Sequence, residues 1–102
     1  MGFKLKPDAT FVATVKLPNG DAPLPIKLVF KRKGKPELAA FIESAATKPD
    51  DELLAEIVAG WQDVDAPFSD ENFRELLTNY NGAGMAIFTG YLRALSEAER
   101  KN

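Results

Sequence analysis

The hydrophobic pattern of this chain changes its period at Gly34. Before that residue, apolar and polar side chains alternate over 10–17 and again over 24–32, the period of two that half-buried β-strands show. The segment 18–21 between them reads Pro-Asn-Gly-Asp, which favours a turn. The first third of the chain therefore predicts an antiparallel β-hairpin over about residues 10–32.

Three apolar side chains of this hairpin, Phe11, Ile26 and Phe30, are expected on one face. A two-stranded hairpin is marginally stable on its own. We therefore expect it either to pack on the rest of the chain or to pair with a second copy. The second arrangement would make a homo-oligomer through the edges of the sheet.

Beyond Gly34, apolar residues recur every three or four positions, the spacing of amphipathic helices. Four helices are expected, over about 36–47, 49–61, 69–80 and 83–98. The second is expected to bury Trp61 in the same stripe as Ile57 and Val58. A hairpin followed by about four helices predicts an α+β fold in one small domain, 1–102.

The helix that begins near Ser69 has the best-marked start in the sequence. Ser69 is a good N-cap residue, and Asp70 and Glu71 follow in the first turn, where the helix dipole favours carboxylates. Phe68 and Phe73 stand at the two positions of a hydrophobic staple. These residues predict a capped helix here.

The chain contains no cysteine and no histidine. Disulfide frameworks, thiolate metal sites and cysteine nucleophiles are thereby excluded, and the commonest general base is missing. The acidic segment 63–71 does not fit a calcium loop, because Phe68 stands where glycine is required and Arg74 where a glutamate is required. No catalytic residue, no metal ligand and no cofactor are predicted, and no stretch is long and apolar enough to span a membrane.

The formal net charge of −2 hides an uneven distribution. Residues 1–35 hold eight Lys or Arg and two Asp, whereas the remainder holds five basic and thirteen acidic residues. The cluster 31–35, Lys-Arg-Lys-Gly-Lys, allows a nucleic-acid-binding module as one interpretation. The sequence pI of about 5.1, and the placement of Phe11 and Phe30 opposite Lys16, favour a solvated basic face instead.

The last predicted helix carries a broad apolar stripe. Its members are Ile87, Phe88, Tyr91, Leu92 and Leu95. A stripe this broad can serve the core on one side and form a groove for a partner's helix on the other. The candidate partner-binding residues are accordingly Phe88, Tyr91, Leu92 and Leu95.

Two motifs follow one another in the second half of the chain. The first, Gly-Trp-x-x-Val-Asp, lies at Gly60, Trp61, Val64 and Asp65, and the second, Leu-Leu-x-x-Tyr, spans 76–80. With them, about residues 8–98 resemble the tail assembly chaperones of tailed bacteriophages or prophages. Asn81 stands where the family pattern has proline.

The resemblance implies a non-catalytic protein of the bacterial host cytoplasm that acts during phage morphogenesis. Such chaperones bind the long tape measure protein, keep it soluble, help to recruit tail tube protein and are absent from the mature virion. Two alternatives stay open. One is a structural tail completion or connector protein of the virion, and the other is a nucleic-acid-binding module that uses the basic hairpin.

Overall fold

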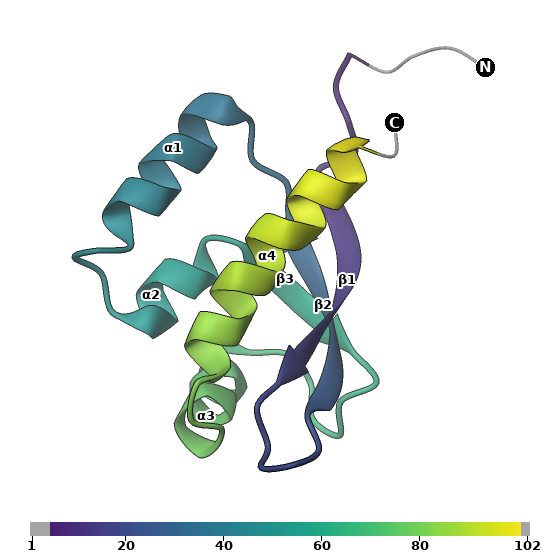
Figure 1. The fold of residues 1–102 in the computed structure, drawn as a ribbon, viewed down its shortest axis with the longest axis vertical. Coiled ribbons are helices and arrows are strands. Elements are labelled where there is room, and N and C mark those ends of the chain that lie inside the picture. The colour runs from purple at the N-terminus through teal and green to yellow at the C-terminus, as the bar shows by residue number, and fades with distance from the viewer. Residues whose placement is uncertain (1–4, 101–102) are drawn as a thin grey trace.

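A computed structural model of the protein describes residues 5–100 and shows an α+β fold, as the sequence predicts (Figure 1). Within those residues the elements follow one another as β1 (Thr10–Leu17), β2 (Leu24–Lys31), α1 (Lys35–Ser44), α2 (Asp50–Ala55), β3 (Val58–Gln62), α3 (Asp70–Asn79) and α4 (Ala83–Arg100). The three strands form one antiparallel sheet in the order β1-β2-β3. The long helix α4 crosses one face of this sheet (Figure 1).

The predicted hairpin is confirmed. β1 and β2 pair without interruption, with Phe11 opposite Phe30 and Val15 opposite Ile26. Gly20 has a φ of 56° in the connecting loop, a left-handed conformation that glycine adopts without strain. The alternation also holds, because Val15, Ile26 and Phe30 are buried. One face of the hairpin therefore belongs to the core of the protein.

The prediction of a helix over 49–61 is wrong in its second half. α2 ends at Ala55, and Val58–Gln62 forms β3, which pairs with β2 so that Trp61 lies opposite Leu28. The β-branched pair at 57–58 and the following Gly60 disfavour a helix. β2 offers them an unpaired edge, and pairing there satisfies backbone groups that would otherwise lack partners.

The start of α3 is as predicted. The Ser69 hydroxyl accepts a hydrogen bond of 3.1 Å from the Asn72 backbone N–H. The rings of Phe68 and Phe73 lie 5.8 Å apart between centroids, which is the hydrophobic staple expected from the sequence. The cap and the staple together fix where this helix begins.

α4 and β1 pack closely because a glycine lies between them. A Cβ atom added to Gly90 would lie 3.0 Å from Cγ2 of the buried Val15. Real Cβ atoms meet neighbours this closely only rarely, so a larger side chain would push α4 away from the strand. Gly90 therefore sets the spacing between the long helix and the sheet.

Candidate partner-binding groove

The structure separates the four candidate partner-binding residues of α4 into two pairs. Tyr91 is fully buried and Leu95 is 5% exposed, whereas Phe88 and Leu92 are half-buried. The ring of Phe88 lies 5.5 Å from that of Phe41 on α1, which accounts for part of its burial. Core residues enclose the side chain of Tyr91 in the structure, and its contact with a partner stays a prediction.

Tyr91 instead connects α4 to the end of β2. Its hydroxyl donates a hydrogen bond of 2.8 Å to the backbone carbonyl of Lys31. Its ring packs against the rings of Phe30 and Phe41, with centroids 5.1 Å and 5.9 Å away. Burial raises the pKa of Tyr91, while a backbone hydrogen bond with Lys33 and the charge of Arg32 oppose that rise. Tyr91 thus positions the basic segment that follows β2.

A groove opens between the start of α1 and the end of α4, and we call it the leucine groove. Its apolar lining is Leu38 from α1 with Leu92 and Leu95 from α4, and its volume is about 730 Å³. The lining is completed by Pro7, Asp8, Ala9 and Ser96 and by the segment 32–35, which we call the basic rim: Arg32, Lys33, Gly34 and Lys35. Two of the residues that sequence analysis named for partner binding therefore line one groove.

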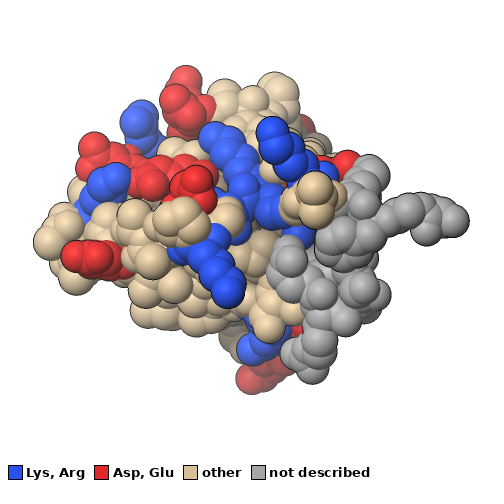
Figure 2. Space-filling view, turned by 90° about the horizontal axis from the view of Figure 1, so that it is seen from above, with Lys and Arg blue, Asp and Glu red and all other residues tan. Residues whose placement is uncertain are grey.

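Contacts with aromatic rings hold part of the basic rim of the leucine groove in place. The Arg32 guanidinium lies 5.2 Å from the centroid of the Phe11 ring, and its Nε donates a 3.0 Å hydrogen bond to the Asp8 carbonyl. The Lys33 ammonium lies 5.9 Å from the centroid of the Phe41 ring. Cations over aromatic faces are attracted by the ring quadrupole. Figure 2 shows Lys and Arg side chains gathered in the middle of one face of the molecule.

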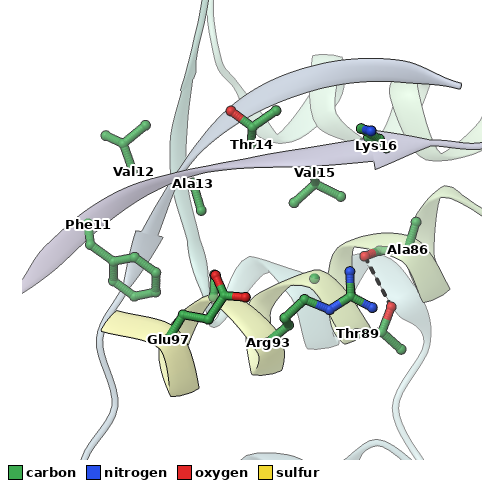
Figure 3. Close-up of a pocket in the computed structure, with 12 residues that line it drawn as sticks. Phe11, Val12, Ala13, Thr14, Val15, Lys16, Ala86, Thr89, Arg93 and Glu97 are labelled. Atoms are coloured by element: carbon green, nitrogen blue, oxygen red, sulfur yellow. Dashed lines mark hydrogen bonds between the residues drawn. The ribbon is translucent and has the colours of Figure 1, made fainter. Parts of the chain in front are cut away.

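A second groove of about 700 Å³ runs between β1 and α4 (Figure 3). Ala13 and Val15 line it from the strand, and Arg93 and Glu97 point into it from the helix (Figure 3). The backbone N–H of Arg32 donates a hydrogen bond to the Ala9 carbonyl, which makes these two residues a hydrogen-bonded pair of the antiparallel ladder. Because hydrogen-bonded and non-hydrogen-bonded pairs alternate, the backbone N–H and C=O groups at positions 10, 12, 14 and 16 of β1 point away from β2. Within residues 5–100 no further strand pairs with this edge. β3 is the other edge of the described sheet, and pairing with a second copy stays a prediction.

The family-motif residues lie in β3 and the loop after it. Trp61 is half-buried, packs edge-on against Phe68 at 5.2 Å between centroids, and donates a 2.8 Å hydrogen bond from Nε1 to the Ala66 carbonyl. Gly60 lies opposite Val29 in the sheet. Val64 is half-buried and Asp65 exposed. Trp61 therefore shapes the loop that leads to α3.

The structure also bears on metal binding and on membrane insertion. Among residues 5–100, no three His, Cys, Asp or Glu side chains lie close enough together to hold a metal ion. In the same part of the chain, no helix combines the length and apolar character needed to span a membrane. What this surface does offer is apolar grooves with charged rims, which is typical of a protein that binds other proteins.

Sequence analysis does not single out Leu38 as a residue of a groove, and it places Lys35 only in the basic cluster 31–35. Their positions in the groove depend on how α1 docks beside α4, which no local pattern encodes. The excess of apolar residues on α4 was the sequence signal that pointed to this region.

A small α+β domain with grooves on its surface is compatible with a protein that works by binding. The sequence matches the phage tail assembly chaperone family over residues 1–102, the whole chain. The chain belongs to this family, and its role is that of a chaperone in tail assembly. No curated protein and no solved structure matches it.

Proposed function

We propose that this protein binds the tape measure protein of its phage, keeps it soluble and assists assembly of the tail tube around it. It does so without catalysis, in the cytoplasm of the bacterial host, and leaves before the virion is complete. Membership of the tail assembly chaperone family supports the general role. The observation that carries the specific one is the leucine groove between α1 and α4.

The groove suits a helical partner. Leu38 comes from one helix and Leu92 and Leu95 from another, so the groove presents leucine side chains from two sides. The apolar stripe of an amphipathic helix can pack against these leucines. Each contact of this size is modest, but many chaperone copies along one long chain would act together through avidity.

The test is co-expression of this chain with the tape measure protein of the same phage. We expect the tape measure protein to move from the insoluble to the soluble fraction and to co-purify with several copies of this chain. A folded but unrelated protein of similar size, expressed from the same vector, is the control. Tape measure protein that stays insoluble with this chain well folded would contradict the proposal.

The virion offers a second readout of the same proposal. Mass spectrometry of purified particles should detect tail tube and tape measure proteins but not this chain. Stoichiometric recovery of this chain in the particle would contradict the proposal and identify a structural tail component instead.

A further inference from the structure

We propose that the leucine groove is built for an acidic amphipathic helix, whose apolar stripe meets the leucines and whose flanking carboxylates meet Lys33 and Lys35. This inference rests on the proposed function and adds the chemistry of the segment that is bound. The groove would then select, along the partner, those helices that carry Asp or Glu beside a leucine-type stripe.

The charge of the rim is the first argument. Arg32, Lys33 and Lys35 line the groove, whereas Asp8 is the carboxylate among its lining residues. Neither Lys33 nor Lys35 forms an ion pair with any residue of the described chain. Cations without an ion-pair partner attract opposite charge and steer its approach. The rim of the groove therefore favours a partner that is locally negative.

The apolar floor is the second argument. Leu38 and Leu92 are half-buried, so each leaves apolar surface that a partner can cover. Covering such surface stabilises a complex, and a helix presents matching side chains every three or four residues. Lysines beside a leucine floor thus fit a segment that is apolar on one stripe and acidic next to it.

A nucleic acid fits this site less well. Leucine side chains make no favourable contact with phosphates, and the rings nearest the basic segment, Phe11 and Phe41, already lie beneath Arg32 and Lys33. Bases that stack on a protein need free aromatic faces. The groove therefore combines a basic rim with a floor suited to protein.

The experiment compares two synthetic helical peptides of about 18 residues, binding to the full chain. Both carry leucines three and four residues apart, and the flanking positions are Glu in one and Lys in the other. We expect the Glu peptide to bind roughly tenfold more tightly at low salt, with the difference shrinking as salt is added. Equal affinities for the two peptides would overturn the proposal.

Charge reversal in the chain supplies the decisive comparison. The double variant Lys33→Glu/Lys35→Glu should lose its preference for the Glu peptide and favour the Lys peptide. The matched control is Lys16→Glu/Arg93→Glu, which makes the same charge change at the second groove, between β1 and α4, and should keep the original preference. Circular dichroism and thermal unfolding confirm that each variant is folded. An unchanged preference in a folded Lys33→Glu/Lys35→Glu variant would overturn the proposal.

A single-stranded DNA oligonucleotide tests the rival occupant. We expect it neither to displace the Glu peptide at moderate salt nor to bind measurably. Displacement of the peptide by DNA, with DNA binding unaffected by Leu92→Gln, would overturn the proposal and make the rim a phosphate-binding surface.

Failure of this inference and failure of the proposed function have different signatures. If tape measure protein still co-purifies fully with Lys33→Glu/Lys35→Glu, the acidic-helix inference fails and the proposed function stands. If the wild-type chain selects the Glu peptide but never solubilises the tape measure protein, the proposed function fails and the chemistry of the groove stands.

Discussion

The Tyr91 hydroxyl, on α4, donates a 2.8 Å hydrogen bond to the carbonyl of Lys31, the last residue of β2. Tyr91 lies in the middle of the longest helix, and Lys31 begins the basic segment that forms one rim of the leucine groove. One buried side chain thus connects the core to the surface that we propose binds the partner. Its ring and its hydroxyl together fix how that rim sits on α4.

Tyr91→Phe keeps the ring but removes this hydrogen bond. The Lys31 carbonyl then lacks that donor, so we expect the free energy of unfolding to fall by about 1 kcal/mol. Urea denaturation at neutral pH measures the change. An unfolding free energy equal to that of the wild type would show that water or another group replaces the hydroxyl.

The same bond predicts a dependence on alkaline pH. Burial raises the pKa of Tyr91, so above about pH 10 an unfolded chain has lost a phenolic proton that the folded chain still holds. The folded state then binds more protons, and its stability must fall as the pH rises through the raised pKa. Below about pH 10 the Tyr91 hydroxyl is protonated in both the folded and the unfolded chain, and its contribution to stability is fully present. We expect the stability difference between wild type and Tyr91→Phe to shrink as pH increases above that point, and a constant difference would contradict this account.

Gly90 tests the packing of α4 on the sheet. A valine there would meet the buried Val15 at a distance where real side chains seldom lie, and we expect a loss of about 1–3 kcal/mol in unfolding free energy. The exposed Met85 provides the control, because Met85→Val places a β-branched side chain at an exposed position of the same helix. Similar losses for the two variants would show that β-branching in α4, and not contact with Val15, governs the effect.

The N-cap of α3 gives a third stability test. Ser69→Ala removes the acceptor for the Asn72 backbone N–H and should cost about 1 kcal/mol. The exposed Ser96 lies within α4, so Ser96→Ala should change stability by less than about 0.5 kcal/mol. Thermal unfolding of the two variants in parallel separates a cap from an ordinary surface serine.

Local signals in the sequence were enough for the hairpin and for α3. The alternation of apolar and polar side chains indicates which faces of β1 and β2 are buried, and Ser69 with its flanking phenylalanines marks the start of α3. Both signals come from residues that lie close together in the chain. β3 was not predictable in the same way. Its five residues follow directly on a short helix, and their strand conformation depends on the free edge of β2, a tertiary feature.

The candidate site was predicted in its region but not in its geometry. The excess of apolar residues on α4 pointed to the helix that lines the leucine groove with Leu92 and Leu95. Which side of the stripe faces the core was not encoded locally. Tyr91 is buried because rings from β2 and α1 surround it, and those contacts join segments far apart in the sequence.

Co-purification with the tape measure protein tests the central claim most directly when two variants of α4 are compared. Leu92→Gln places a polar group in the leucine groove, whereas Thr89→Gln makes a similar change on the exposed side of the same helix. With both variants shown to be folded, we predict that Thr89→Gln recovers as much soluble tape measure protein as the wild type and that Leu92→Gln recovers far less. Equal recovery with the two variants would contradict binding through this groove.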